Sequence, residues 1–480
     1  MESIWSKTAE IPARPRLEGD LKVEAAVIGG GMAGVLTAWQ LRQKGVEAVV
    51  LEARRLGSGQ TKNTTAKITA QHGLIYAKLI ETLGEEAARQ YARANTRAIE
   101  EYRRVVEAEG IDCAFEDRPA YLYSTVTDDA VREEARAAAS LGIDAAFTGE
   151  TSLPFPVKGA VRFNRQAQFH PLRFLEGAAR NLTVYEDTRV LKVAGGRIET
   201  EQGTVEAKHI VFATHYPFVN FPGYYFLRQH QERSYVIALE GAAELDGMYR
   251  GTDPGALSFR NVGSCLLLGG ENHRTGENSA GGRYRALREQ GERLFPKSRE
   301  VAHWSAQDCM TLDGVPYIGR YAAASEPDWY VATGFQKWGM TSSMVAAMVI
   351  SDLITGRENP DAAVFDPGRF HLAASAQNLW EDGKQTVKGL SRQIFSPPRA
   401  DLDALPPGHG GVVDCDGEKV GVYKNEDGEI FMVSTRCPHL GCQLEWNPDE
   451  KSWDCPCHGS RFDPLGRLID NPAQENLERA

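Results

Sequence analysis

The feature that most constrains the fold of this chain is a glycine-rich turn between two short apolar segments near the N-terminus. Residues 23–29 (VEAAVIG) are typical of a buried strand, MAGVLTAWQLRQKG continues with helical periodicity, and VEAVVLE is typical of a second strand. The turn, residues 29–34, reads GGGMAG. This order predicts a strand, a turn, a helix and a parallel second strand, and therefore an α/β domain whose sheet is covered by helices.

The spacing of the glycines also predicts a ligand. Gly29 allows the tight turn, Gly31 lets a pyrophosphate approach the backbone, and Gly34 permits close packing of the helix on the strand. Glu52 ends the second strand 21 residues after Gly31, where its carboxylate can accept the hydroxyl groups of an adenosine ribose. We therefore predict that FAD or NAD binds at Gly29, Gly31, Ala33, Gly34 and Glu52.

A later glycine turn favours FAD. Residues 328–356 read as strand, glycine turn and helix, so the backbone N–H groups of Gly339, Met340 and Thr341 would begin a helix. Such a helix terminus stabilises negative charge, and reduced flavin is an anion with its charge near the pyrimidine edge. An ordinary strand–turn–helix unit without a ligand is the alternative interpretation.

A cluster of potential metal ligands lies near the C-terminus. Residues 437–460 (CPHLGCQLEWNPDEKSWDCPCHGS) contain four of the eight cysteines and two of the eleven histidines. Thiolate and neutral imidazole bind zinc or iron. A zinc site would use Cys-x-x-Cys pairs, whereas mixed Cys-x-His and Cys-x-x-His pairs are typical of a [2Fe-2S] centre with two thiolates on one iron and two imidazoles on the other. The predicted ligands are Cys437, His439, Cys455 and His458; a zinc ribbon is the alternative.

This segment resembles the Rieske domain. In addition to the four ligands, the resemblance implies a disulfide between Cys442 and Cys457 and a hydrogen bond from the Ser460 hydroxyl to a bridging sulfide. Phe462 stands where the Rieske proteins of highest potential carry a tyrosine that donates to a ligand sulfur. With one donor fewer, we expect a lower reduction potential.

The first 370 residues resemble the FAD-dependent oxidoreductases of the D-amino-acid oxidase and glycine oxidase superfamily. The resemblance rests on VIGGGMAGVLTAWQL at the first turn, QAQFHP at 166–171, IVFATHYP at 210–217, LDGVPYIG at 312–319 and ATGFQKWGM at 332–340. It implies non-covalent FAD held by the residues above. It also implies that Val190 lies near the adenine and Thr214 near the adenosine end.

The expected architecture is an α/β FAD-binding domain of the Rossmann type with an interleaved α+β substrate domain, followed by a small all-β Rieske domain. A chain of 480 residues is too long for one hydrophobic core. We expect FAD-binding parts at about 20–75, 160–220 and 305–365, substrate parts at about 76–159 and 221–304, all within 1–375, a linker at 376–401 and the Rieske domain at 402–480.

The charge is concentrated at the C-terminal end. Of the net charge of −11, residues 401–480 contribute −9. This distribution argues against nucleic acid and anionic membranes as partners. It suits either a solvated acidic face or a docking surface for a basic redox partner. Because no run of 18 apolar residues and no apolar signal core occurs, we expect no membrane span and a cytoplasmic location.

The two cofactors together favour one class of function. A flavin takes two electrons as a hydride, whereas a [2Fe-2S] centre takes one at a time. We therefore expect oxidation of a small amine or amino acid, with the Rieske centre passing electrons to a redox protein or a quinone. A reductase running from NAD(P)H would need a second dinucleotide motif, which the sequence lacks. A redox sensor, an electron carrier and a plain oxidase with a regulatory Rieske module are the alternatives.

The substrate-binding residues are the least defined part of the sequence. Related amino acid oxidases commonly hold the substrate carboxylate with an arginine shortly before the LDGVPYIG-like segment, but this chain has Asp308 there. That difference favours a cationic amine. The other polar candidates for substrate contact are Lys337, His273, Tyr235 and Arg233, and no catalytic base can be named.

Overall fold

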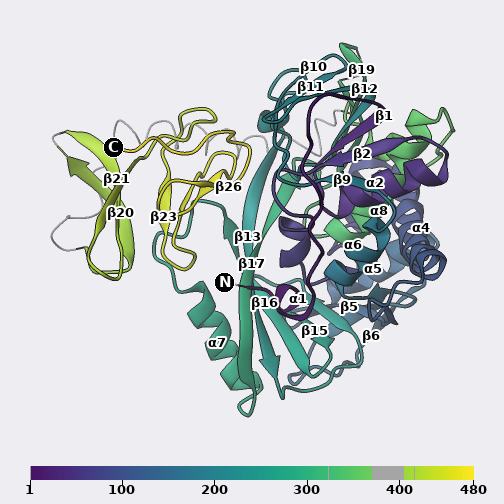
Figure 1. Ribbon diagram of the computed structural model, residues 1–480. Coiled ribbons are helices and arrows are strands. Elements are labelled where there is room, and N and C mark those ends of the chain that lie inside the picture. The colour runs from purple at the N-terminus through teal and green to yellow at the C-terminus, as the bar shows by residue number, and fades with distance from the viewer. Residues whose placement is uncertain (1, 323, 370–404, 416) are drawn as a thin grey trace.

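The computed structural model describes residues 2–322, 324–369, 405–415 and 417–480. Two large sheets, each of eight strands, are built from residues 2–369, and a module of two small sheets follows (Figure 1). The module lies beside the long strands of the second sheet, and most of the helices lie on the far side of the molecule. The predicted linker, residues 376–401, lies outside the described residues.

The first sheet contains the predicted strand–turn–helix–strand unit. β1 (Leu21–Ile28) is parallel to β2 (Ala48–Leu51) and to β12 (Thr204–Phe212), and the glycine turn leads from β1 into α2 (Met32–Gln43). α2 packs on α8 (Gly339–Ile354). The residues of β1, β2 and β12 that lie beneath the helices are apolar and buried, as is usual in a parallel sheet covered by helices. The order is β10–β11–β12–β1–β2–β9, with β19 beside β12 and β18 beside β19. The remaining bounds are β9 Thr183–Tyr185, β10 Val190–Ala194, β11 Arg197–Thr200, β18 Tyr317–Ala322 and β19 Glu326–Thr333.

The second sheet is mostly antiparallel. Its strands run β17–β13–β16–β15–β14–β5–β7–β6, and β13 (Gln229–Glu240) pairs along its whole length with β17 (Arg299–Thr311). The other bounds are β5 Ala120–Ser124, β6 Ala145–Thr148, β7 Gly159–Phe163, β14 Met248–Gly251, β15 Ser258–Val262 and β16 Cys265–Arg274. β7 and β17 of this sheet overlap the beginnings of the FAD-binding parts expected at about 160–220 and 305–365, whose bounds stay predictions.

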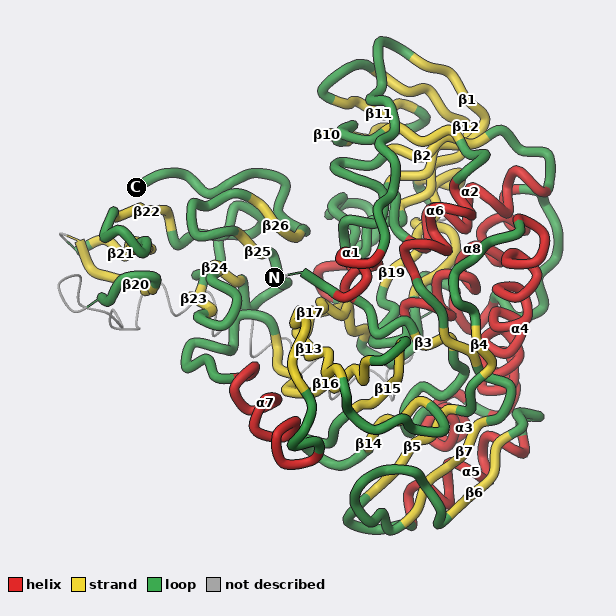
Figure 2. Tube along the Cα trace, turned by 60° about the horizontal axis from the view of Figure 1, so that its bottom comes forward, coloured by secondary structure: helices red, strands yellow, loops and turns green. Residues whose placement is uncertain are grey.

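The helices cover the two sheets unevenly (Figure 2). α7 (Arg283–Leu294) packs on β13 and β16, whereas the long α4 (Glu85–Glu109) packs on α8 and on α3 (Tyr76–Leu83). None of the helices in the described ranges has both the length and the apolarity that crossing a membrane requires. The remaining elements are α1 Ile4–Thr8, α5 Asp129–Ser140, α6 Pro171–Ala179, η1 Gln60–Asn63, η2 Tyr225–Leu227, η3 Ala363–Phe365 and a small sheet of β3 Lys67–Ile68, β8 Ala167–Gln168 and β4 Glu116–Asp117.

The C-terminal module is all-β, as the sequence predicts. One sheet has the order β20–β21–β22 and the other β23–β24–β25–β26. Trp453 and Phe462 are fully buried at the centre of the module, where Trp446 packs on Trp453. The bounds are β20 His409–Cys415, β21 Glu418–Lys424, β22 Ile430–Ser434, β23 Glu445–Asn447, β24 Ser452–Asp454, β25 Arg461–Phe462 and β26 Leu468–Asp470.

Candidate functional site

The glycine turn after β1 has the shape that a dinucleotide needs. Gly29 has φ +111°, and a Cβ there would lie 2.5 Å from the Ala213 carbonyl oxygen. A Cβ on Gly34 would lie 1.9 Å from the Gly29 carbonyl oxygen, so neither position accepts a side chain. A Cβ on Gly31 would meet only the Thr61 hydroxyl, at 3.4 Å. The open space is therefore beside Gly31, where the pyrophosphate of FAD would approach the backbone.

Glu52 is held in place at the end of β2. Its Oε2 accepts a hydrogen bond from Gly30 N (2.6 Å) and its Oε1 accepts one from Arg54 N (2.9 Å). Burial raises the pKa of Glu52, and these two N–H groups oppose the increase. Each oxygen keeps a further lone pair for a ribose hydroxyl. Val190 and Thr214 lie on the same sheet, at the start of β10 and just after β12; their contacts with the cofactor stay predictions.

The second glycine turn begins α8. The amide of Ser342 donates to the Trp338 carbonyl, so the N–H groups of residues 339–341 precede the hydrogen-bonded part of the helix. A Cβ built on Gly339 meets nothing within 4 Å. The structure therefore fits a flavin edge against Gly339, Met340 and Thr341, the role that the family resemblance implies.

The charged residues next to this turn pair with one another. The Lys337 ammonium lies 3.0 Å from Glu232 and 2.9 Å from Asp308. Burial would raise the pKa of Glu232, but the charges of Lys337 and His230 hold it well below its ordinary value. Because Asp308 is neutralised by Lys337, it no longer supports the sequence-based preference for a cationic amine.

Two further cations lie near this group and were not predicted from the sequence. The Arg250 guanidinium lies 5.7 Å from the Trp338 ring centroid, and no carboxylate of the described residues forms an ion pair with it. Lys67 donates to the Tyr249 carbonyl (3.1 Å). Burial lowers the pKa of both cations, and repulsion by Arg250 lowers that of Lys67 further. Asp308 and Glu232 act on Arg250 from a longer distance and partly offset this lowering of its pKa. Arg250 therefore lies beside the flavin turn without a direct carboxylate partner among the described residues.

The second sheet separates this charged group from the C-terminal module. Successive side chains of a strand point to opposite faces. On β13, Glu232 and Ser234 contact Lys337, whereas Gln231 and Arg233 contact the module. We call these the flavin face and the module face. On β17, Asp308 lies on the flavin face and Gln307 contacts the module.

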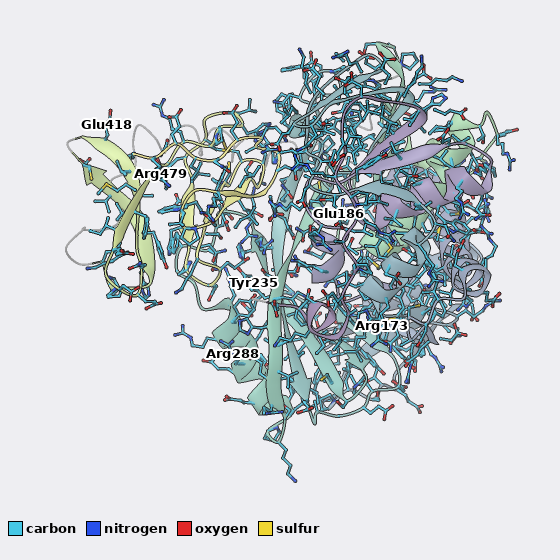
Figure 3. The ribbon with its side chains drawn as sticks, in the orientation of Figure 1. Arg173, Glu186, Tyr235, Arg288, Glu418 and Arg479 are labelled. Carbon is cyan, nitrogen blue, oxygen red and sulfur yellow. A yellow bond between two sulfur atoms is a disulfide. The ribbon has the colours of Figure 1, made fainter. Side chains whose placement is uncertain are left out.

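Tyr235 and His273, which the sequence suggested as substrate contacts, belong to the module face. The Tyr235 hydroxyl and His273 Nε2 are 3.0 Å apart, and Asn278 connects Tyr235 to Asn447 of the module. Figure 3 shows Tyr235 in the strands that border the module. We therefore withdraw both residues, together with Arg233, as substrate contacts, because strand alternation turns them away from Lys337.

The predicted cluster ligands converge in two loops of the module. The Cys437 and Cys455 thiols are buried and in contact, and the hydrogen bond from Cys455 lowers the pKa of Cys437. Backbone N–H groups point at both sulfurs. The His439 and His458 rings lie 4.9 Å apart, and His439 Nδ1 is buried without a hydrogen-bond partner. Buried thiols with N–H donors and a histidine nitrogen kept for a ligand fit a [2Fe-2S] cluster.

The two loops are joined by a Cys442–Cys457 disulfide. Those two sulfurs lie close to Cys455, but a disulfide sulfur is not a thiolate ligand, so these three cysteines do not form a zinc site. The Ser460 hydroxyl hydrogen-bonds Cys437 and accepts from Ala473 N (3.0 Å).

The histidine edge of the cluster site is covered by the first 369 residues. His458 is 3% exposed, and His439 Nε2 lies 2.9 Å from Asn220 Oδ1. The Phe226 ring contacts both imidazoles edge-on. The histidine edge therefore contacts the FAD-dependent oxidoreductase part of the chain. Asn220 and Phe226 gave no signal in the sequence because their role depends on the placement of the module.

Comparison with known proteins agrees with this geometry. Residues 24–353 match the family of FAD-dependent oxidoreductases called DAO, and residues 398–480 match the Rieske [2Fe-2S] domain. A putative Rieske 2Fe-2S iron-sulfur protein of Bacillus subtilis, YhfW, is 35% identical over 496 residues, which cover 100% of this chain and 97% of that protein. A cytochrome b6-f complex iron-sulfur subunit of Nostoc is 34% identical over 116 residues, 23% of this chain and 63% of the subunit.

Solved structures with the same fold include two enzymes named for amino acids. Glycine oxidase from Geobacillus kaustophilus aligns with a TM-score of 0.59 at 19% identity, over 73% of this chain and 99% of that one. L-proline dehydrogenase from P. horikoshii aligns with a TM-score of 0.59 at 18% identity, over 74% and 98%. At 19% and 18% sequence identity, the similarity to these two structures establishes the fold alone. The chain thus belongs to the DAO family of FAD-dependent oxidoreductases and carries, in addition to its FAD-binding part, a C-terminal Rieske [2Fe-2S] domain.

Proposed function

We propose that this enzyme oxidises the C–N bond of a small amino acid, or of another amine that carries a carboxylate, and passes the electrons from FAD through the Rieske cluster to an external acceptor. The observation that carries the proposal is the arrangement of the second sheet. Its flavin face bears the charges suited to a substrate, and its module face holds the cluster loops. One sheet therefore borders both redox sites.

The charges on the flavin face favour a substrate with an anionic group. Arg250 is half-buried and forms no ion pair with a carboxylate of the described residues, so an incoming carboxylate would gain charge-assisted hydrogen bonds there. The names of the solved neighbours, glycine oxidase and L-proline dehydrogenase, support an amino acid.

The chemistry then balances as a two-electron oxidation. When bound, FAD supplies a hydride acceptor and the cluster supplies a one-electron carrier. The substrate loses a C–H hydride and an N–H proton and becomes an imine, and its two electrons leave one at a time. The chain's own residues orient the carboxylate and exclude water from the reacting bond. The acceptor, a redox protein or a quinone, and the cytoplasmic location stay predictions.

An anaerobic screen tests the proposal. Amino acids and amines without a carboxylate are added to the FAD- and iron-loaded protein, the flavin absorbance is followed, and the cluster is examined by EPR. We expect carboxylate-bearing amines to bleach the flavin and then to produce the EPR signal of a reduced Rieske cluster. Bleaching only by amines without a carboxylate would refute the substrate class. If the flavin is bleached while the cluster stays oxidised, the result would favour a plain oxidase with a regulatory module. If no compound bleaches the flavin, it would favour a redox sensor.

A further inference from the structure

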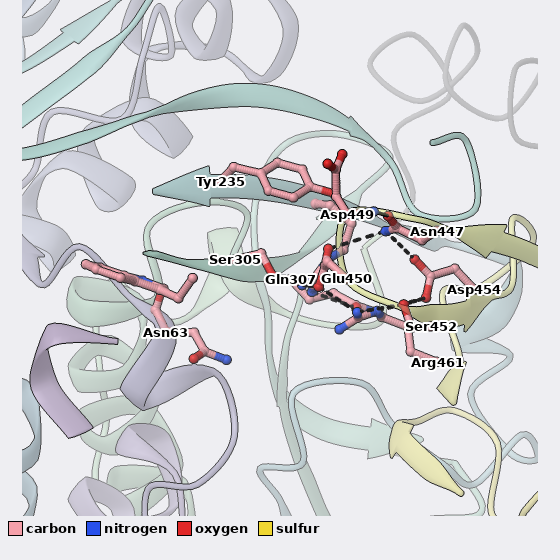
Figure 4. A network of polar contacts seen from close by, with 12 residues as sticks. Asn63, Tyr235, Ser305, Gln307, Asn447, Asp449, Glu450, Ser452, Asp454 and Arg461 are labelled. Carbon is pink, nitrogen blue, oxygen red and sulfur yellow. Dashed lines mark hydrogen bonds and ion pairs between the residues drawn. The ribbon is translucent and has the colours of Figure 1, made fainter. Parts of the chain in front are cut away.

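A buried network of charges holds the Rieske module against β13. The Glu450 carboxylate of the module accepts hydrogen bonds from Arg233 Nε (3.0 Å) and from Arg461 Nη2 (2.6 Å), and Arg461 also binds Asp454 (Figure 4). The side chains of Arg233 and Glu450 are each 2% exposed. Separating the module would break the buried pair of Arg233 with Glu450, whereas Glu450 and Asp454 would keep Arg461. The module is therefore firmly docked.

Two glutamines extend this interface to the cluster loop. Gln307 donates to the Gly459 carbonyl (2.7 Å), and Gln231 donates to the His458 carbonyl (2.8 Å) and to the Asn471 carbonyl (3.1 Å). Gly459 has φ +83°, and a Cβ there would lie 2.6 Å from the Gln231 Cβ, so the loop and the strand are closely fitted.

Gln231 and Gln307 differ in the residues that their side-chain oxygens contact. The Gln231 Oε1 is 3.1 Å from His215 Nε2, and the His215 carbonyl accepts from the Thr333 hydroxyl (2.7 Å). Thr333 ends β19, and the chain continues from there into the flavin turn at 339–341. Hydrogen bonds through Gln231 and His215 therefore connect the loop of His458 to the end of β19, and the covalent chain leads from there into that turn. The Oε1 of Gln307, by contrast, accepts from Arg233 and leads back into the charge network.

We propose that Gln231 is a positioning residue that fixes the His458 loop relative to the flavin turn and thereby sets the rate of electron transfer between the two cofactors. The inference rests on the proposed function for the direction of transfer. The hydrogen bond between Gln231 and His215, rather than the attachment of the loop to Gln231 alone, is the contact that determines the rate.

Three variants separate these two roles. Gln231→Leu removes both the loop contacts and the hydrogen bond to His215, and His215→Phe removes only the latter. Gln307→Leu is the matched control, which removes a loop contact and a hydrogen bond from Arg233 but leaves the hydrogen bond between Gln231 and His215 in place. The flavin of each FAD- and iron-loaded protein is reduced photochemically without substrate, and the first-order appearance of the reduced cluster is measured. The EPR g values and midpoint potential of the cluster are recorded as well.

We expect Gln231→Leu and His215→Phe to lower the rate constant by about tenfold, which corresponds to about 1.4 kcal/mol in activation free energy. The g values and the potential of the His215→Phe cluster should match the wild type, and Gln307→Leu should keep the wild-type rate. Equal slowing in all three variants, or no slowing in His215→Phe, would overturn the inference, even if Gln231→Leu fails to assemble its cluster. A wild-type cluster that stays oxidised would instead overturn the electron route of the proposed function.

Discussion

At the scale of single residues, the substrate site is defined by the charges that the protein does not neutralise itself. Lys337 is balanced by Glu232 and Asp308, so it contributes little to the attraction of an anion. Arg250 lies over the Trp338 ring and forms no ion pair with a carboxylate of the described residues, although Asp308 and Glu232 act on it from farther away. A guanidinium in this situation is best stabilised by a planar carboxylate, which it can bind with two parallel hydrogen bonds.

Replacing Arg250 should therefore impair substrate binding. We expect Arg250→Gln to raise KM for a carboxylate substrate by about a hundredfold, because charge-assisted hydrogen bonds contribute about 1.5 to 3 kcal/mol. The FAD content should not change. Steady-state kinetics on a substrate from the anaerobic screen measure the effect, and Arg162→Gln, an exposed arginine on β7 of the same sheet, is the control. An unchanged KM in Arg250→Gln would remove the anion site from the proposal.

A second residue-scale prediction concerns the space beside Gly31. Because a Cβ there meets only the Thr61 hydroxyl, Gly31→Val should fold but place its methyl groups in the pyrophosphate path. We expect protein that lacks the flavin absorbance near 450 nm, about where oxidised flavins absorb, but retains its iron and Rieske EPR signal. Stoichiometric flavin in this variant would show that the cofactor lies elsewhere. Gly34→Ala, whose Cβ would lie 1.9 Å from a carbonyl oxygen, should instead damage the fold.

At the scale of elements, β13 shows which parts of the candidate site could be predicted from the sequence and which could not. The glycine turns and the cluster loops were predictable because their function depends on local spacing along the chain. The first residues of β13, Gln-His-Gln-Glu-Arg-Ser, are polar on both faces, so they lack the apolar alternation that identifies a strand with one buried face. Both faces are polar because one borders the flavin site and the other borders the module, which only the tertiary structure reveals.

The network at the end of β13 yields an element-scale prediction. Glu450→Gln leaves the buried guanidinium groups of Arg233 and Arg461 facing each other without their shared carboxylate. We expect a loss of about 3 to 5 kcal/mol in the stability of the docked module, the usual effect of removing one partner from a buried ion pair. Urea unfolding followed through the visible absorbance of the cluster measures it.

The control for this prediction is Glu426→Gln, since Glu426 pairs with Lys451 at the surface and should give no measurable change. The pH dependence offers a further check. Burial would raise the pKa of Glu450, but the two arginines hold it well below its ordinary value of 4.5. The ion pairs of the Glu450 carboxylate therefore stabilise the folded protein fully above pH 4.5. This stabilisation decreases as the pH falls below 4.5 and is lost when the pH reaches the lowered pKa of the folded state. A wild-type and a Glu450→Gln protein of equal stability at pH 7 would contradict the docking role.

At the scale of the whole molecule, the sequence predicted two parts but not how they fit together. The FAD-binding part and the Rieske domain each have local motifs, whereas the interface between them is built from polar side chains such as Gln231, Arg233 and Asn278. Such residues look like ordinary surface residues in a sequence. The contacts of Asn220 and Phe226 with the histidine edge therefore depend on the tertiary structure and give no signal in the sequence.

This fixed arrangement predicts different salt dependences for the two electron-transfer steps. In the proposed route, electrons pass from flavin to cluster within one docked molecule. The rate constant of this step should then be independent of protein concentration and nearly independent of ionic strength, because a buried network is poorly screened. Transfer from the cluster to a basic redox protein should slow as salt increases, since residues 401–480 carry a net charge of −9 and would steer such a partner over long distances. Anaerobic stopped-flow mixing with substrate at several salt and protein concentrations measures the first step, and the addition of a small basic cytochrome measures the second. An internal rate that rises with protein concentration would mean that electrons pass between molecules, and the docked module would then not be the acceptor of its own flavin.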